Sequence, residues 1–382
     1  MENDSCAKSF IKYSGDEISK TDTYRNDKPD GIVREYHDNG QLKKEVIYIN
    51  GQIEGIAKTF DEKGNLINEI PYKNGEIEGV WKEYYKNGKL KFLLPYRNGK
   101  IDGVAKWYYE NGKLEVERSY LNGKLEGVMK YYYENGKLKT EARYQNGEME
   151  GVARGYYKNG MLQVEFQYKN GKRVGVNKKY HENGELKTET LYKDGVRSGV
   201  REEYYENGHF KRGATYINGK IEGTVKTLYE NGNIANEITY KNGEIDGIWR
   251  EYYENGNLKF EFPYKSGQLN GVAKWYHEDG KLKKEEPYRN DKLEGVWKLY
   301  YENGNLYQEA NYKNDIQIGV MKVYRKSGEV LVELLYKAGD AVSGVRVALN
   351  GTRTPLTSAE IFKWNNGDGI DCPDLCFSGI SQ

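Results

Sequence analysis

Several features that catalytic, disulfide-stabilised and membrane proteins need are scarce in this sequence. Its 382 residues hold three cysteines and four histidines, and hydrophobic residues reach only 37%. Three cysteines are too few for a disulfide framework, and no run approaches the roughly 18 apolar residues of a membrane-spanning helix. The balance of 59 basic against 58 acidic residues leaves no global field that would attract nucleic acid or an anionic membrane.

The start of the chain gives the only sequence information on localisation. Met1 to Phe10 lack the basic and apolar regions of a signal peptide. The sequence therefore predicts a cytoplasmic protein if this N-terminus is complete, and an exported one if a signal peptide was removed.

What the sequence has instead is a strict internal repeat of 24 residues. Glycine recurs at every 24th position from Gly40 to Gly328, thirteen times, and ten of these glycines follow Asn. Asn-Gly between β-prone runs predicts a hairpin with a type I′ turn, in which both central residues take positive φ. A second turn is predicted at the series that begins with Gly51, in which Asp27, Asp291 and Asp315 replace glycine.

The turn position fixes a predicted register and two faces. If Asn111 and Gly112 are the two turn residues, Lys106 lies opposite Glu117. One face then carries Ala105, Trp107, Tyr109, Leu114, Val116 and Tyr120, and the other carries Val104, Lys106, Tyr108, Glu115 and Glu117. The ion pairs recur as Lys130 with Glu141, Arg250 with Glu261 and Lys274 with Glu285. Because these basic residues are paired, we expect no nucleic-acid surface.

Stacked hairpins of this kind predict an all-β fold. We expect an elongated single-layer antiparallel sheet of about thirteen tandem 24-residue β-hairpin repeats, in which ladders of tyrosine replace a core. Residues 1–23 and 340–382 do not fit the unit and are predicted to cap the array at 24–339. Thr357-Ser358-Ala359-Glu360 matches a capping box, which predicts a short helix in the C-terminal cap.

The repeat pattern also resembles a known family. Gly127-Val128-Met129-Lys130-Tyr131-Tyr132-Tyr133-Glu134-Asn135-Gly136-Lys137-Leu138, followed by Tyr144-Gln145-Asn146-Gly147, is similar to the MORN-repeat variant common in bacteria. The resemblance covers about residues 24 to 339. It implies a sheet used for protein interaction or, in eukaryotic relatives, for membrane association, and many bacterial members carry the label of a YwqK-like antitoxin. The family brings no shared catalytic residues.

Candidate chemical groups are few and dispersed. His37, His181 and His277 occupy the position of Tyr109 in repeats far apart along the array, so they are expected to replace an aromatic ring rather than share a metal. His209 follows a turn glycine and is expected to be exposed. Cys372 and Cys376 lack zinc or redox spacing and fit a small disulfide loop or two free thiols, with Cys6 far away. Asn366, Asp368 and Asp371 lack the full calcium-loop pattern. We expect no enzyme activity, cofactor or metal.

A longer period points to the candidate binding residues. Residues 74–114 match residues 242–282 at an offset of seven units, so that Trp81 and Trp107 recur as Trp249 and Trp275. All four, with Trp297, fall on the face predicted to be apolar. We therefore expect a scaffold whose aromatic face binds protein partners. The alternatives are an antitoxin or immunity protein with one toxin partner, and a membrane-associated or exported surface protein.

Overall fold

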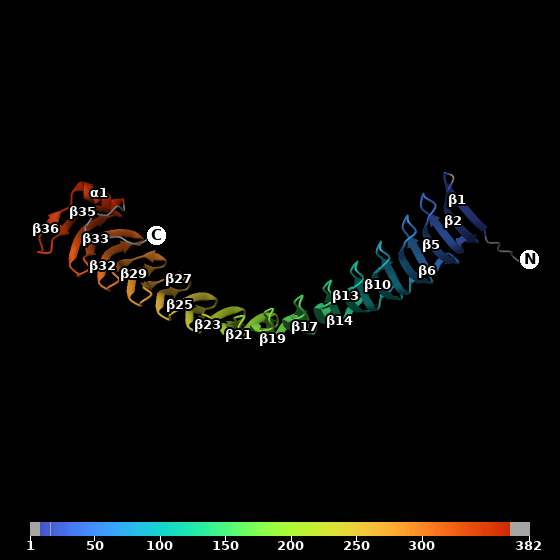
Figure 1. Cartoon of the computed structure of the whole chain (residues 1–382), viewed down its shortest axis with the longest axis horizontal. Coiled ribbons are helices and arrows are strands. Elements are labelled where there is room, and N and C mark those ends of the chain that lie inside the picture. The colour runs from blue at the N-terminus through green and yellow to red at the C-terminus, as the bar shows by residue number, and fades with distance from the viewer. Residues whose placement is uncertain (1–7, 16, 367–382) are drawn as a thin grey trace, which may run out of the picture. The chain divides into compact units, whose positions relative to one another are not determined.

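The computed structural model describes residues 8–15 and 17–366, and most of them belong to antiparallel β-strands. The chain forms two compact units, residues 1–196 and 197–382. Each unit is a sheet of consecutive hairpins whose strands lie side by side (Figure 1). The predicted all-β fold of tandem hairpin repeats is confirmed. Among the described residues, no helix has the length and apolar character to cross a membrane.

The described residues of the first unit form twenty strands. They are β1 (Lys8–Ser14), β2 (Glu17–Arg25), β3 (Lys28–Pro29), β4 (Gly31–Tyr36), β5 (Leu42–Ile49), β6 (Gln52–Phe60), β7 (Leu66–Lys73), β8 (Glu76–Ile77), β9 (Gly79–Tyr84), β10 (Leu90–Arg97), β11 (Lys100–Ile101), β12 (Gly103–Tyr108), β13 (Leu114–Leu121), β14 (Lys124–Tyr132), β15 (Leu138–Gln145), β16 (Glu148–Met149), β17 (Gly151–Tyr156), β18 (Leu162–Lys169), β19 (Lys172–Tyr180) and β20 (Leu186–Lys193).

The second unit contains the remaining strands and the helix. They are β21 (Val196–Tyr204), β22 (Phe210–Ile217), β23 (Lys220–Leu228), β24 (Ile234–Lys241), β25 (Glu244–Tyr252), β26 (Leu258–Lys265), β27 (Gln268–Leu269), β28 (Gly271–Tyr276), β29 (Leu282–Arg289), β30 (Lys292–Leu293), β31 (Gly295–Tyr300), β32 (Leu306–Lys313), β33 (Ile316–Tyr324), β34 (Val330–Lys337), β35 (Asp340–Val347), β36 (Arg353–Pro355) and α1 (Ser358–Asn365).

The central register of each hairpin is the predicted one. In the hairpin of β12 and β13, Lys106 pairs with Glu117 and Trp107 with Val116. The equivalent ionic pairs share this register: Lys130 with Glu141, Arg250 with Glu261 and Lys274 with Glu285. Because a one-residue slip would exchange the faces, the side chains at the centre of each strand lie on the predicted sides.

The first turn of the repeat differs from the prediction. The Tyr109 N–H donates to Lys113 O and the Gly112 N–H to Tyr109 O, both at 2.8 Å, so three residues form the loop. Gly112 has a φ of 89°, but Asn111 is not in the positive-φ region. The type I′ prediction is therefore wrong here, since only the glycine of this loop needs the left-handed conformation. The Asn111 amide instead donates to Glu134 O of the next repeat at 3.4 Å.

Type I′ turns are found at the second turn. Asn122 and Gly123 have φ values of 49° and 82°, and Leu121 pairs with Lys124 across them. The aspartates predicted to replace glycine in this series, Asp27, Asp291 and Asp315, have φ values of 60°, 65° and 68°. That prediction is confirmed.

A bulge restores the register that the three-residue turn would otherwise shift. Tyr108 pairs with Leu114 and Trp107 with Val116, which leaves Glu115 as an extra residue. Leu114 therefore lies on the face of its partner Tyr108. Lys91 is equivalent to Glu115 in the preceding repeat, and it forms a 2.6 Å ion pair with Glu83, which is equivalent to Trp107. The position of Glu115 therefore lies on the face of Trp107. The predicted faces of Leu114 and Glu115 are thus wrong, because the bulge exchanges them.

The buried side chains of both units lie on the face of Trp107. Ala105 and Ala273 are fully buried there although the sheet is a single layer, because longer side chains of neighbouring repeats cover them. The largest cluster is at the C-terminal end, where Met321, Val323 and Leu334 are at most 2% exposed. Helix α1 packs its Ile361 and Trp364 side chains against this cluster.

The predicted C-terminal helix is confirmed together with its capping box. Thr357 is the N-cap residue of α1, and its Oγ1 accepts a hydrogen bond from the Glu360 N–H at 3.3 Å. The Glu360 carboxylate accepts one from the Thr357 N–H at 2.7 Å. These two bonds satisfy amide groups that the first turn of a helix leaves free.

The N-terminal segment continues the repeat register with a shorter turn. In the hairpin of β1 and β2, Phe10 pairs with Asp22, which is equivalent to Arg118, the partner of Ala105. Tyr13 pairs with Ile18, so the loop is one residue shorter than the one between Tyr108 and Leu114. This one-residue difference hides residues 8–14 from a search for the 24-residue period.

One hairpin of the first unit has a polar interior. The buried polar residues of the described chain, Asn177, His181, Thr188 and Thr190, all belong to β19, β20 or the loop between them. The Asn177 amide donates to Val174 O at 3.1 Å, while its Oδ1 has no hydrogen-bond partner among the described residues. An unsatisfied buried oxygen is unfavourable, so this hairpin is less stabilised than its apolar equivalents.

Candidate functional site

The five tryptophans predicted to bind partners all lie on one side of the sheet. Trp81, Trp249 and Trp297 are equivalent to Ala105 and pair with Leu94, Phe262 and Ala310. Trp107 and Trp275 share a position two residues further on, and therefore the same face. This surface, formed by the residues equivalent to Ala105, Trp107, Val116, Arg118 and Tyr120, is called the aromatic face below.

The aromatic face of the second unit carries a cluster of five packed rings. Trp249 contacts Phe260 at 5.4 Å and Phe262 at 6.2 Å between centroids, and Tyr264 at 6.3 Å. Phe262 stacks on Phe260 at 4.2 Å and reaches Trp275 at 4.8 Å. All five rings are half-buried. They hold one another in place and leave apolar ring surface open to a partner.

The first unit has a sparser version of the same arrangement. Trp81 packs edge-on against Phe92 at 5.6 Å, which reproduces the geometry of Trp249 and Phe260. Trp107 lies under the guanidinium of Arg118, whose carbon is 5.2 Å from the ring centroid. The seven-unit duplication has therefore kept the packing of the first tryptophan, while Leu94 stands at the position equivalent to Phe262 and Arg118 of the following strand packs on the second.

Polar groups on this face are mostly bound to neighbours. Lys284 Nζ lies 3.9 Å from the Trp275 centroid, and the Trp297 indole N–H donates to Glu286 at 3.1 Å. The Trp249 indole nitrogen is buried and has no hydrogen-bond partner among the described residues. The chemistry offered by the face is therefore mainly dispersion, with cation–π contacts at its margins.

The opposite face carries a ladder of alternating charges. Lys130 pairs with Glu117 of the preceding hairpin and with Glu141 of its own, and the pattern repeats along both units. Representative ion pairs are Lys106 with Glu117 at 3.1 Å and Lys226 with Glu237 at 2.8 Å. The pKa of Glu237 is lowered, chiefly by its hydrogen bond from Lys226. The lysines and arginines of the ladder are therefore neutralised by its glutamates.

Tyrosines equivalent to Tyr108 donate to the glutamates of this ladder. Tyr300 bonds to Glu285 at 2.8 Å and Tyr324 to Glu309 at 2.7 Å. Burial, followed by the hydrogen bond to the carboxylate, raises the pKa of both hydroxyls. These tyrosines are held neutral in the folded state.

The raised tyrosine pKa values predict a loss of stability in alkali. Because the folded-state pKa lies above the unfolded one, the contribution is complete below about pH 10 and is lost as pH rises through the folded value. The free energy of unfolding, measured by urea denaturation, should fall less steeply from about pH 9 to about pH 11 in the Tyr300→Phe, Tyr324→Phe variant than in wild type. The exposed Tyr13→Phe change is the control. Equal slopes for wild type and the double variant would contradict the prediction.

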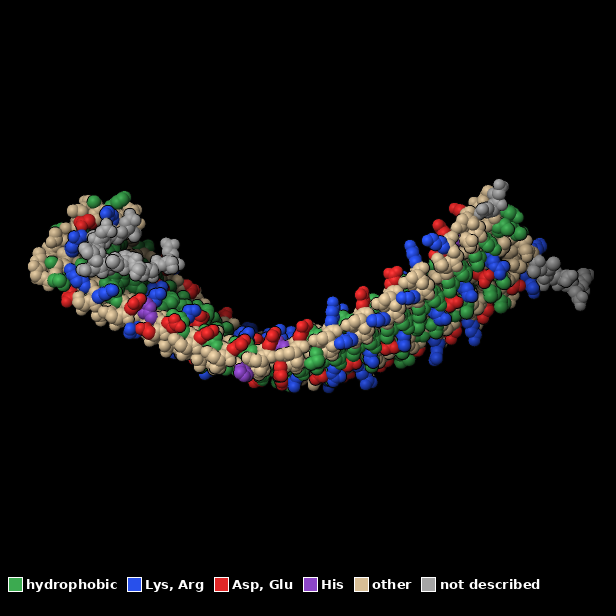
Figure 2. Space-filling model, viewed as in Figure 1, with side chains coloured by type: hydrophobic (Ala, Val, Ile, Leu, Met, Phe, Trp, Pro, Cys, Tyr) green, Lys and Arg blue, Asp and Glu red, His purple; other side chains and the backbone are tan. Residues whose placement is uncertain are grey.

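Sequence reasoning missed a row of exposed aliphatic side chains on the charged face. The residues equivalent to Val104 are almost all Val or Ile, and Val104 itself is 41% exposed. The other exposed members are Ile32, Ile56, Val80, Val128, Val152, Val200, Ile248, Val272, Val296 and Val320. The sequence placed Val104 on this face, but only the structure shows that the described residues leave the row exposed. Figure 2 shows hydrophobic side chains along the strands with charged ones at their margins.

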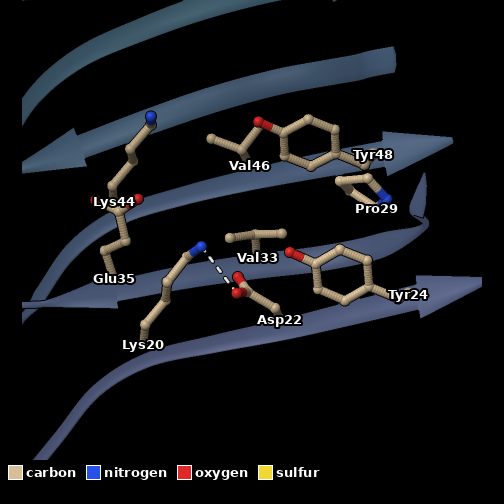
Figure 3. A pocket seen from close by; sticks show the side chains of 9 residues that line it. All are labelled: Lys20, Asp22, Tyr24, Pro29, Val33, Glu35, Lys44, Val46 and Tyr48. Carbon is tan, nitrogen blue, oxygen red and sulfur yellow. Dashed lines mark ion pairs between the residues drawn. The ribbon is translucent and has the colours of Figure 1, made fainter. Parts of the chain in front are cut away.

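A pocket of about 80 Å³ opens on the aromatic face near the N-terminal end. Val33 and Val46 are buried at its base, and Lys20 forms a 2.8 Å ion pair with Asp22 at its edge (Figure 3). It is lined by Lys20, Asp22, Tyr24, Pro29, Val33, Glu35, Lys44, Val46 and Tyr48. The hollow exists because valines stand at positions that hold Trp or Arg in other repeats.

The histidines occupy the predicted positions in the turns. His37 Nε2 lies 3.0 Å from Phe60 O, the geometry that Tyr85 Oη has with Tyr108 O at 2.7 Å. His37 therefore replaces a tyrosine, as expected. His209 is exposed, as predicted.

No group of three or more His, Cys, Asp or Glu able to hold a metal occurs within residues 8–15 and 17–366. Cys6, Asp368, Asp371, Cys372 and Cys376 lie outside the described residues. Of the candidate calcium residues only Asn366 is described, and it forms the C-cap of α1. The disulfide and calcium hypotheses therefore stay as the sequence left them.

A family model described as the MORN repeat variant matches most of the chain. The match leaves out residues 195–220, which include the hairpin of β21 and β22. In this hairpin Glu202 pairs with Gly213, where other repeats pair a basic residue with Glu. The matched segments are residues 29–50, 53–74, 77–98, 101–122, 125–146, 149–170, 173–194, 221–242, 245–266, 269–290 and 293–314. No curated protein matches the chain.

Several solved structures share a low level of similarity with this chain. A TcdB2–TccC3–Cdc42 complex is 12% identical over 90% of this chain, with a TM-score of 0.15. A Photorhabdus luminescens Tc holotoxin pore is 11% identical over 89%, also with a TM-score of 0.15. A TcdB2–TccC3 structure without the hypervariable C-terminal region is 13% identical over 96%, with a TM-score of 0.16. This chain spans about a quarter of each of theirs.

Proposed function

The chain belongs to the family of MORN repeat variants, and from this premise we propose that it is a non-catalytic repeat scaffold that binds protein partners through its aromatic face. The residues assigned to binding are Trp81, Trp107, Trp249, Trp275 and Trp297. No cofactor takes part in this function.

The packed ring cluster around Trp249 and Trp275 is the observation that supports the proposal. Tryptophan and tyrosine dominate the binding energy of protein interfaces. Rings already held by their neighbours, such as Phe262 between Phe260 and Trp275, lose little conformational freedom on binding. A repeat sheet also spreads such groups along a surface, which suits recognition of a macromolecule better than conversion of a small substrate.

The test is affinity capture from an extract of the natural source, followed by a direct affinity measurement on the captured protein. The Trp107→Ala, Trp275→Ala variant should bind at least about tenfold more weakly, because truncating a central interface aromatic costs more than about 1 kcal/mol. Val104→Ala, Val272→Ala is the matched control, since both valines are 41–43% exposed on the opposite face. Equal loss in both variants, or in neither, would reject the aromatic face as the binding surface.

Each of the alternative functions has its own expected result. An antitoxin or immunity protein would show a single tight partner with one-to-one stoichiometry. Membrane association is favoured by the exposed aliphatic row at Val104, and would appear as binding to anionic lipid vesicles that Val104→Ala, Val272→Ala weakens and the tryptophan variant does not. An exported surface protein would be found outside the cell by fractionation.

A further inference from the structure

The first strand of the sheet has a free edge and an exposed apolar surface. β1 pairs with β2 and with no other described strand. Every residue of β1 is exposed, including Phe10 at 53%, Ile11 at 54% and Tyr13 at 57%. An edge strand of this kind presents unpaired backbone N–H and C=O groups to another chain, and β1 contains no proline that would prevent pairing.

The C-terminal end of the second unit is protected in a way that β1 is not. Helix α1 packs against β35, where Asn365 Oδ1 accepts a hydrogen bond from the Ala341 N–H at 2.8 Å and its amide donates back to Ala341 O at 3.1 Å. The outermost strand, β36, has only three residues. Pairing between a β1 edge and this end is therefore disfavoured, and pairing between two β1 edges is left.

We infer that β1 pairs antiparallel with β1 of a second copy of this chain, with Ile11 on the two-fold axis. Directly opposed residues of an antiparallel pair lie on the same face, and successive residues of a strand alternate between faces. The two-fold axis therefore passes between a residue and its own copy, because an axis between two successive residues would oppose residues of different faces. An axis at Phe10 would place Lys8 opposite Lys12, and an axis at Lys12 would place two Lys12 side chains together, both unfavourable. An axis at Ile11 places Phe10 opposite Lys12 and Lys8 opposite Ser14, with no like charges opposed.

The contact is isologous, so it closes at a dimer instead of extending into a fibre. A two-fold axis perpendicular to the sheet continues the aromatic face of one copy into that of the other, and the dimer therefore doubles the binding surface. A seven-residue strand pair buries less area than stable interfaces do, so the dimer should dissociate on dilution. The inference does not depend on the identity of any other partner.

Sedimentation velocity over a dilution series tests the association. Wild type should shift from twice the chain mass of 44.1 kDa to the monomer mass on dilution. Ile11→Lys, which brings two positive charges together on the axis, should remain monomeric with an unchanged circular dichroism spectrum, because Ile11 is exposed in the single chain. Wild type that stays monomeric at its highest soluble concentration, or an Ile11→Lys variant that still dimerises, would overturn the inference.

Cysteine crosslinking tests the register independently of affinity. In a background with Cys6, Cys372 and Cys376 replaced by Ser, Ile11→Cys should form a covalent dimer on mild oxidation, since directly opposed residues lie within disulfide reach. Tyr13→Cys is the matched control, because Tyr13 faces Ser9 of the other copy. Equal crosslinking at both positions would refute the register.

Deletion of residues 1–7 tests the main competing occupant of the edge. If wild type is monomeric and the deletion variant dimerises, the chain's own N-terminal segment covers β1 and the inference is wrong. If both dimerise, the second copy is the occupant. Partner capture by the aromatic face should persist in Ile11→Lys, so failure of this inference and failure of the proposed function are distinguishable.

Discussion

Replacing Leu334 with alanine should lower the stability of the C-terminal end by about 2–5 kcal/mol, the cost of removing a large buried aliphatic side chain. Leu334 is completely buried in the cluster with Met321 and Val323. Few other parts of the described sheet have a core of this size, so little surrounding material can collapse into the cavity.

Because neighbouring repeats stabilise each other locally, the loss at Leu334 should be confined to part of the second unit. Native-state hydrogen exchange should show faster opening of β33, β34 and β35, with strands of the first unit unchanged. Leu349→Ala is the matched control, since Leu349 is 76% exposed and should change stability by less than about 0.5 kcal/mol. A uniform acceleration along both units would show that the effect is global.

The second large effect is expected at Gly271, which begins β28. Its φ is 128°, and a Cβ at this position would lie 2.9 Å from Cγ of Pro263. An alanine must therefore accept both an unfavourable backbone conformation and a contact with a rigid ring. We expect Gly271→Ala to lower stability by about 2–3 kcal/mol, at the upper end of the cost of such strain.

Gly151 is the matched control for Gly271, because it occupies the equivalent position five repeats of 24 residues earlier. Its φ is 77° and no atom lies within 4 Å of the Cβ site. Gly151→Ala should therefore cost only about 1 kcal/mol, the strain of the left-handed conformation alone. Chemical denaturation of the two variants gives the comparison. Equal losses would mean that Pro263 moves aside at little cost.

The strand pattern and central register could be predicted from the sequence because they depend on periodic residues. The opposite charges of Lys106 and Glu117 indicate that these residues are paired, and the same pairing recurs at Lys130 and Glu141. The helix α1 was predictable for a similar reason, since Thr357 and Glu360 carry the complete local signal.

The details of the turn could not be predicted, because two departures from the ideal hairpin compensate for each other. The three-residue loop at Gly112 shifts the register by one residue, and the bulge at Glu115 shifts it back. The paired residues at the strand centre are therefore the same with or without the two departures. Only the faces of Leu114 and Glu115 differ, and both residues are compatible with either side.

The degree of burial of individual side chains also could not be predicted from the sequence pattern. The tryptophan positions indicate a face, but whether Trp249 is covered or open depends on Phe260 and Phe262 in the neighbouring strand. The exposure of Val104 likewise arises because no second layer of described residues lies over the charged face, which a β-branched residue alone does not reveal.

The hydrogen bonds between successive turns restrict how the length of this protein can change. Tyr85 Oη donates to Tyr108 O, Tyr109 Oη to Tyr132 O and Tyr133 Oη to Tyr156 O, each across 23 residues. Deleting or duplicating a segment of 24 residues would keep every remaining donor opposite an equivalent acceptor. A change of any other length would misalign all such bonds at the junction. Homologues of different length are therefore expected to differ by whole units, and recombination between repeats is the genetic route that this geometry tolerates.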